Sequence, residues 1–329
     1  MATITKTANV EFKGKETYGI WAQPIMQAPE SPFMGWTKMM NVKYRSQKLL
    51  YNNHLRNIVK KGGSCGFNAD GSFDIYGRTI TTKELKAELS LCAKNFNCTE
   101  IEELLATGTA KPDIIGSTLS AVILKQMADG ARYDLYLNAW FGEEDSARGY
   151  FDKFDGIWTY IKELADGDYI PYNDSGSGSA LAPTDALDIL QKVYNDQSNA
   201  LFQVSDTQKV FYVSRSVYQA LMADYTILNS LNCDLALINT MEGKRMLTFY
   251  GIEVRPEAIW NDYFNAASLT NQHYILLTVP ENLAVATNQE QDLNKVESWY
   301  ERKEQLNHFR AEFEFGVNFI HPELFSVAY

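Results

Sequence analysis

Glu312 and Glu314 are the first residues in this sequence whose types and spacing could do chemistry. They stand two positions apart in a stretch that alternates apolar and polar residues, which places both carboxylates on one face of a strand, about 7 Å apart. Two carboxyl groups at such a distance could serve as the acid and the base of a glycosidase. Because the solvent face of a single strand is a weak basis for such a site, we interpret them as surface charges.

Two other groups of residues have the chemistry of metal ligands. A zinc site could be built from Cys92 and Cys98 with a histidine, although the cysteines show no CxxC spacing. Residues 143–145 are three adjacent acids, but they follow a predicted helix, where a solvated loop is the simpler interpretation. We predict no metal site, and we expect reduced thiols in a cytosolic setting. The cysteines are Cys65, Cys92, Cys98 and Cys233.

Nucleophiles and phosphate-binding loops give no stronger signal. Ser175 and Ser177 lie in a stretch rich in glycine and serine, residues 173–179, which is a poor support for a nucleophile that needs fixed geometry. The sequence contains no HExxH, GxGxxG or GxxxxGK[ST] motif. The histidines are scattered: His54, His273, His308 and His321. We therefore predict no catalytic residue and no cofactor, and a protein that is not an enzyme.

Composition and charge are those of a soluble globular protein with one uneven feature. The chain has 329 residues, of which 45% are hydrophobic, enough for one large domain or two to three smaller ones. No apolar run approaches the roughly 20 residues that cross a bilayer, and the first residues lack the apolar core of a signal peptide. We expect no membrane segment.

The chain has a net charge of −11, but its first sixty-one residues are positively charged. Residues 1–61 contain ten Lys and Arg against three acids, which gives +7 there and leaves −18 for the rest of the chain. A basic leading segment could bind nucleic acid, or it could lie on the acidic body of another copy of the same chain. The acidic total argues against nucleic-acid binding by the body itself.

The two glutamates belong to the strongest structural signal in the sequence, residues 309–319. Every odd position there is apolar, and the even positions are Arg310, Glu312, Glu314, Gly316 and Asn318. This period of two predicts a long strand with one face in a core and one in water. The strand should stop at His321-Pro322-Glu323, since proline has no N–H to donate, before a short second run at 324–327.

A long helix should lie against that strand. Ser117 is a credible N-cap, and the helical pattern ends at Phe141-Gly142. The helix has a broad apolar face, which would pack across a sheet, with the apolar face of residues 309–319 as its natural partner.

The first ninety residues are expected to be extended. Residues 1–40 hold three closely spaced prolines and many large apolar side chains, which predicts an arm lying on a neighbouring copy or on its own domain. Residues 41–91 should form a long hairpin with a turn at residues 68–71. The run 85–91 could also be a short helix, although we favour a strand.

The remaining part of the chain alternates helices and strands, which indicates an α/β or α+β subdomain. Residues 150–182 are expected to be a long connection that includes the glycine- and serine-rich loop. The expected elements are a helix at 185–194, a buried strand at 210–213, a helix from Ser214 to Tyr225, and strands at 246–254 and 274–279.

This order of parts resembles the major capsid protein of tailed bacteriophages, which has the Hong Kong 97-like fold. The most specific stretch is Phe309-Arg310-Ala311-Glu312-Phe313-Glu314-Phe315-Gly316-Val317-Asn318-Phe319-Ile320-His321-Pro322-Glu323-Leu324-Phe325, a long strand followed by Pro-Glu and an aromatic residue. Residues 249–254 and 282–287 also resemble segments that precede this ending. The likeness covers most of the chain through loose patterns.

The resemblance implies an α+β fold with four parts. The parts would be an N-terminal arm (1–40), an extended loop or E-loop over a neighbouring subunit (41–91), a peripheral domain (92–149 and 309–329) with a spine helix (117–141), and a mostly axial domain (150–308). Alternatives to the capsid reading are a cargo-holding compartment with the same fold and an unrecognised enzyme.

The resemblance also implies a structural function without catalysis. Copies would form hexamers and pentamers of an icosahedral head around the DNA genome, touching packaged DNA only indirectly. Further partners would be scaffolding, portal, and minor capsid or decoration proteins. The protein would reside in the virion, and in the host cytoplasm during assembly. Inter-subunit contacts are then expected from basic and aromatic residues of the arm and loop: Trp21, Trp36, Lys43, Arg45, Lys48, Arg56, Lys60 and Lys61.

Overall fold

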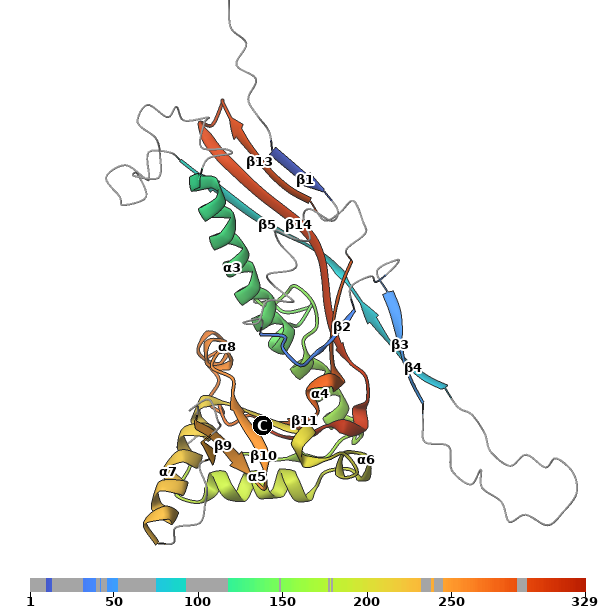
Figure 1. Ribbon diagram of the computed structural model, residues 1–329, viewed down its shortest axis with the longest axis vertical. Helices are drawn as coiled ribbons and strands as arrows, with labels where there is room; N and C mark the ends of the chain where they lie inside the picture. The colour runs from blue at the N-terminus through green and yellow to red at the C-terminus, as the bar shows by residue number, and fades with distance from the viewer. Residues whose placement is uncertain are drawn as a thin grey trace, which may run out of the picture.

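A long strand, β14 (Leu306–Phe319), lies at the centre of the computed structural model of the chain (Figure 1). This strand confirms the prediction made from the period-two pattern, and it begins slightly earlier than expected. The structure describes residues 10–13, 32–39, 42, 46–52, 75–92, 118–147, 149–176, 178, 180–231, 238–239, 245–288 and 295–329.

The first sheet is built on both edges of β14. Its other strands are β1 (Val10–Lys13), β2 (Thr37–Met39), β5 (Lys83–Leu91), β12 (Leu283–Thr287) and β13 (Lys295–Glu301). β12 and β13 pair antiparallel with the two halves of one edge of β14, and β5 pairs antiparallel with the other edge. β1 adds to β13, and β2 adds to β12 in parallel.

The two halves of β14 differ in burial. Up to Glu312, buried and half-buried residues alternate, as expected for a strand with one face in water. From Phe313 onward every residue is buried, which corrects the expectation of a solvent face along the whole strand. The second face of this half is covered by β4 (Ile75–Thr81), and the side-chain amide of Asn318 donates a hydrogen bond to the carbonyl of Thr79 at 2.8 Å.

The hairpin predicted within residues 41–91 is confirmed. β3 (Ser46–Asn52) and β4 form an antiparallel ladder, which lies to the side of the body in Figure 1. β5 continues from β4 as a strand and not as a helix. The turn expected at residues 68–71 lies outside the described residues.

The expected long helix is α3 (Thr118–Phe141), and its proposed N-cap, Ser117, lies outside the described residues. In Figure 1 the helix runs along the first sheet, beside β5 and β14. The ring of Phe33 lies between the two elements, 5.4 Å from the ring of Tyr136 on α3 and 5.6 Å from that of Phe315 on β14. The helix and the strand therefore share one core, as expected, with an arm residue between them.

A seven-stranded sheet forms the second part of the body. Its strands, in spatial order, are β6 (Tyr172–Asn173), β15 (Ser326–Ala328), β11 (Ile275–Thr278), β7 (Val210–Val213), β10 (Ile252–Pro256), β9 (Arg245–Phe249) and β8 (Ile238–Asn239). The expected strands 210–213 and 274–279 are therefore confirmed as β7 and β11. Two expected helices are also present: α5 (Asp185–Asn195) and α7 (Arg215–Leu231).

The side chains of β7 point alternately into two clusters of buried residues, one on each face of the second sheet. Phe211 and Val213 pack with α5 and α7 on one face of the sheet. Tyr212 packs on the other face with the end of α3, with α4 (Ile157–Asp166) and with α8 (Trp260–Ala267). The second sheet is therefore covered by helices on both faces, which explains the continuous apolar runs of its central strands.

The expected single strand at 246–254 is wrong. The chain reverses there in a two-residue turn at Tyr250-Gly251, so that Ile252 pairs with Phe249 and β9 and β10 form a hairpin. Both turn residues have positive φ, 49° at Tyr250 and 81° at Gly251. Those values fit a type I′ turn, whose first position rarely holds a tyrosine, and this is why the sequence pattern concealed the turn.

The expected long connection at 150–182 is also interrupted by a helix, α4. Trp158 and Ile161 of α4 are buried, and the ring of Trp158 lies 5.4 Å from that of Trp260 on α8. The remaining short elements are α6 (Asn199–Phe202) and the 3-10 turns η6 (Asp206–Gln208), η7 (Pro280–Asn282) and η8 (Pro322–Leu324).

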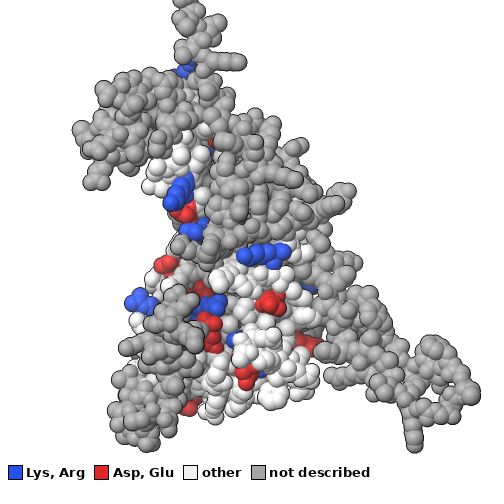
Figure 2. Space-filling view, in the orientation of Figure 1, with Lys and Arg blue, Asp and Glu red and all other residues white. Residues whose placement is uncertain are grey.

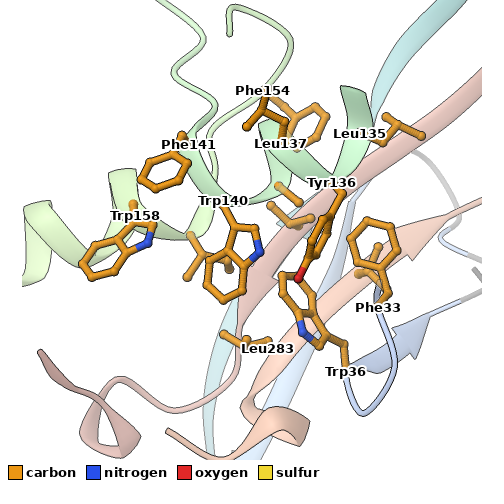
Figure 3. Close-up of a cluster of buried hydrophobic side chains, with 14 of the residues drawn as sticks. Phe33, Trp36, Leu135, Tyr136, Leu137, Trp140, Phe141, Phe154, Trp158 and Leu283 are labelled. Carbon is orange, nitrogen blue, oxygen red and sulfur yellow. The ribbon is translucent and has the colours of Figure 1, made fainter. Parts of the chain in front are cut away.

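The two sheets do not divide where the sequence suggested. The strands β12 and β13 precede residue 309 but pair with β14, whereas β15 follows it but pairs with β11 and β6. The chain therefore crosses between the sheets twice within residues 275–329, from β11 to β12 and from β14 to β15. One buried cluster joins the two parts, and Figure 3 shows Trp140 at its centre, between Tyr136 and Trp158.

Candidate functional site

The glutamate pair of β14 is used within the chain. Glu314 is only 1% exposed, and one of its carboxylate oxygens accepts a hydrogen bond from the hydroxyl of Thr82 at 3.1 Å. Glu312 lies 3.1 Å from the guanidinium of Arg310, which also lies 2.9 Å from Glu88 on β5. The two carboxylates therefore have structural partners and do not face a common cleft.

The candidate metal ligands are not brought together in the described part of the chain. Glu144, of the acidic triplet, forms an ion pair with Lys83 at 2.6 Å, and its backbone N–H donates to Asp155. Cys92 is a free thiol. The other cysteines, Cys65, Cys98 and Cys233, lie outside the described residues. Among the residues that the structure describes, no group of three His, Cys, Asp or Glu could hold a metal ion.

The serine and histidine candidates hold segments of the fold together. Ser175 is 2% exposed and accepts a hydrogen bond from the side-chain amide of Asn271 at 3.1 Å. His308 lies 2.8 Å from the hydroxyl of Ser90, which ties β14 to β5. His54 and Ser177 lie outside the described residues.

One serine and one histidine do come within hydrogen-bond distance. The hydroxyl of Ser216 lies 2.9 Å from Nδ1 of His273, and it also donates to the carbonyl of Gln272 at 2.9 Å. His273 is 5% exposed, and these bonds link the start of α7 to the segment before β11. We interpret this pair as structural.

A serine in a GxSxG spacing, Ser64 within residues 62–66, also lies outside the described residues. It falls between β3 and β4, which pair as a hairpin. A nucleophile elbow instead joins a strand to a helix, so the surrounding topology does not support that chemistry.

The residues predicted to contact other subunits are described in only two cases. Trp36 is 4% exposed, and its ring lies 5.3 Å from that of Trp140 in the core of its own chain. This corrects our expectation for Trp36 and agrees with the alternative, an arm packed on its own domain, for residues 32–39. Lys48 lies on β3, and the other six residues lie outside the described part: Trp21, Lys43, Arg45, Arg56, Lys60 and Lys61.

Other large apolar side chains are exposed on the body. Tyr150 is 84% exposed, Tyr169 74% and Phe202 64%. An open groove of about 680 Å³ runs between β5 and α3, with an apolar floor that includes Leu85, Met127 and Phe313. Figure 2 shows basic and acidic side chains interspersed over the face in view. These surfaces were not recognisable in the sequence, because they depend on how the elements pack.

A buried polar junction joins α3 to the second sheet. The hydroxyl of Tyr136 donates to Glu257 at 2.7 Å, and Glu257 is 8% exposed. Burial raises the pKa of Glu257 to about 7, and the hydrogen bond from Tyr136 and the charge of Arg255 limit the rise. One turn earlier on α3, the hydroxyl of Tyr133 donates to Asp262 of α8. Two tyrosines of one helix face therefore hold two carboxylates of the second part.

No model of a known protein family matches the chain, and no curated protein matches its sequence. Solved structures do match. A chain of the satellite phage P4 procapsid including size determination (Sid) protein superposes with a TM-score of 0.58 and 11% identity, covering 91% of this chain and 86% of that one. The capsid of the native GTA particle gives a TM-score of 0.51 and 13% identity, covering 89% and 87%.

This chain has the fold of phage capsid proteins. A third match, the virus-like particle from Pyrococcus furiosus, has a TM-score of 0.50 and 10% identity, and the alignment covers 96% of this chain and 99% of that one. At these identities the likeness concerns the fold, and the resemblance inferred from the order of elements is confirmed at that level. Within the described residues no helix is both long and apolar enough to span a membrane.

A second group of polar contacts that sequence reasoning missed lies at the base of the hairpin. Arg78 and Thr79 of β4 are bonded to Asn318 of β14. The only signal in the sequence was Gly316, a residue without a side chain inside a long strand pattern, which often marks a close approach of another backbone.

Proposed function

We propose that this chain is the major capsid protein of a tailed double-stranded DNA phage. Many copies, arranged as hexamers and pentamers, would form the icosahedral head around the genome. The observation that carries this proposal is the match to phage capsid structures over most of both chains. The protein would act by association, in the virion and beforehand in the host cytoplasm.

The parts of the chain would divide the work of assembly. Residues 1–40 would be an arm, residues 41–91 an E-loop reaching over a neighbouring subunit, and α3 the spine helix of a peripheral domain. The second sheet would form most of an axial domain. The β3–β4 hairpin supports the second of these roles, because it lies to the side of the body (Figure 1) and a two-stranded hairpin is only marginally stable without a further packing surface.

Charge supports the way in which copies would meet. The first sixty-one residues carry +7 and the rest −18, so the arm and loop of one copy would be attracted to the body of the next. Lys43, Arg45 and Lys48 would contribute with Arg56, Lys60 and Lys61, and Trp21 would add apolar surface. An acidic body would also avoid adhering to packaged DNA. Scaffolding, portal, and minor capsid or decoration proteins would complete the particle.

A compartment that encloses other cargo is a second candidate. The likeness to the virus-like particle from Pyrococcus furiosus, which extends over nearly the whole of both chains, favours it. Both functions require a closed shell, so they differ in what the shell contains and in which neighbouring proteins it needs.

Electron microscopy of the protein, expressed alone and together with the proteins encoded beside it, tests the proposal. We expect closed shells or flat hexameric sheets. A monomer or dimer under all these conditions would contradict both shell functions. Shells that form only with a portal or scaffolding protein and that take up DNA would favour the phage head over the compartment.

A further inference from the structure

The β3–β4 hairpin leaves the body at a point where one strand crosses another. β5 pairs with residues 307–315 of β14, whereas β4, immediately before it in the chain, pairs with β3. Between these two ladders lies Thr82, which is 3% exposed and whose hydroxyl bonds to Glu314. In Figure 1, β5 and the β3–β4 hairpin lie on opposite sides of β14, so the chain crosses β14 between β4 and β5.

Gly316 makes this crossing possible. A Cβ atom at residue 316 would lie 2.1 Å from the carbonyl oxygen of Thr81 and 3.2 Å from the Cα of Thr82. Both are backbone atoms, so any side chain at this position would displace the crossing strand. The glycine in the period-two pattern is therefore required by the path of β4 over β14.

Asn318, two residues later on the same face, binds β4 through both the nitrogen and the oxygen of its side-chain amide. Its Nδ2 donates to the carbonyl of Thr79 at 2.8 Å, and its Oδ1 accepts from Nε of Arg78 at 3.0 Å. The same oxygen accepts from the backbone N–H of Phe319 at 2.8 Å, which fixes the orientation of the amide. Asn318 is 5% exposed, so these bonds form away from water, where geometry is strongly specified.

Arg78 and Ile80 extend the contact to both sides of the crossing. The guanidinium carbon of Arg78 lies 3.7 Å from the centre of the Phe319 ring and 5.6 Å from that of Tyr160 on α4, as in a cation–π contact. Ile80 is fully buried and packs on Ala284 and Ala286 of β12. Small side chains at those two positions let β4 approach the sheet closely.

We propose that Gly316 and Asn318 are positioning residues that set the direction in which the β3–β4 hairpin leaves the body, before any neighbouring subunit is present. The benefit for assembly rests on the proposed function, since an E-loop that already points in the right direction would reach its neighbour without first being ordered. The positioning of the hairpin itself does not depend on that function. The pairing of β3 with β4 alone leaves the angle to the body free.

A distance measurement on the unassembled chain tests the geometry directly. Spin labels would be placed at Asn52→Cys, at the end of β3, and at Lys125→Cys, an exposed position of α3, after replacing the native cysteines by serine. In N318L the hairpin loses its two hydrogen bonds to the amide, those of Arg78 and Thr79, while an apolar side chain keeps the position buried. We expect the distance distribution to broaden and its mean to shift relative to the labelled parent chain.

The matched control is N307L, the same substitution at a buried position of the same strand, 1% exposed and opposite Leu91 and Tyr300. We expect its distance distribution to superpose on that of the parent. An unchanged distribution in N318L, or equal shifts in both variants, would overturn the proposal. If N318L does not fold, R78M removes one bond of the same contact and is expected to broaden the distribution as well.

Assembly gives the second readout. The parent and N307L should form regular particles, whereas N318L, although folded, should give open or irregular ones. If the parent forms no particle under any condition, the proposed function fails, but the distances still decide the positioning role. If N318L shifts the distances and yet assembles normally, the proposed consequence of the hairpin's direction is wrong.

Discussion

Glu257 shows how one residue can make the stability of this chain depend on pH. Its carboxyl group is buried beside Tyr136, and its pKa is raised from 4.5 to about 7. The folded state therefore holds a proton that the unfolded state releases between these values. It follows that the stabilising contribution is fully present below about pH 4.5 and is lost as the pH rises through about 7.

We predict that E257Q removes this dependence. The amide is neutral at all pH values and can still accept the hydrogen bond from Tyr136, so the variant avoids the burial of a charge. The free energy of unfolding of E257Q minus that of the parent is a measure of this dependence. We expect this difference to be about 3 kcal/mol larger at pH 8 than at pH 4. Urea titrations of the unassembled chain at both pH values measure the difference. A parent and a variant with parallel pH profiles would contradict the assignment.

Replacing glycine by alanine should have opposite effects on stability at Gly130 and at Gly316. G130A places a methyl group in open space within helix α3, where nothing lies within 4 Å, and should stabilise the chain by about 0.5–1 kcal/mol. G316A forces the methyl group into the backbone of Thr81 and should destabilise it by about 1–3 kcal/mol or more. Thermal unfolding of both variants measures the two signs, and equal signs would show that the crossing of β4 over β14 is wrong.

At the scale of elements, residues 32–39 show an arm segment that belongs to its own chain. Phe33 and Trp36 are buried between α3 and the first sheet, and β2 pairs with β12. The segment therefore contributes to the core of the body. Its apolar composition was visible in the sequence, but the surface that covers it was not.

We predict that W36A destabilises the chain by about 3–5 kcal/mol, because it removes a buried indole that contacts Tyr136 and Trp140. The control is M34A in the same segment. Met34 is 66% exposed, and its loss should change stability by less than about 0.5 kcal/mol. Denaturant unfolding of the unassembled chain compares the two. Similar small effects would mean that the segment is not part of the folding core.

The sequence predicted those elements in which a local pattern and the packing agree. The first half of β14 alternates buried and half-buried residues as its period-two pattern predicted, and α3 occupies the range that its helical pattern indicated. The hairpin of β9 and β10 was concealed because Tyr250 occupies a turn position that usually holds asparagine or glycine. The full burial of β14 from Phe313 onward was not predictable either, since it depends on the distant strand β4. Local patterns do not record which other strand covers a face.

The candidate site was less predictable than the fold for the same reason. The basic and aromatic residues of the leading segment were proposed from their charge, their apolar character and the resemblance to capsid proteins, and Trp36 was then found in the core of its own chain. Asn318 and Glu257 carry no local signal, because an asparagine in a strand or a glutamate after one is ordinary. Their roles come from partners more than a hundred residues away in the sequence.

At the scale of the whole molecule, the separation of charge suggests how copies attract one another. A leading segment of +7 and a remainder of −18 give a long-range attraction between unlike parts of neighbouring copies, against a net repulsion of the bodies. Salt weakens both terms, since the Debye length falls from about 14 Å at 0.05 M to about 4 Å at 0.5 M. Which term dominates decides the sign of the salt effect on assembly.

We predict that the attraction dominates. Raising the salt concentration from about 0.05 to 0.5 M should raise the protein concentration at which particles appear by about tenfold. The triple variant K48Q/R56Q/K60Q should assemble poorly at low salt and respond less to added salt.

A matched triple variant at exposed positions of the body, K125Q/K192Q/K303Q, removes the same charge but should assemble at least as well as the parent. Light scattering against concentration measures all three chains. Equal losses in the two variants would show that net charge, and not the basic leading segment, controls assembly.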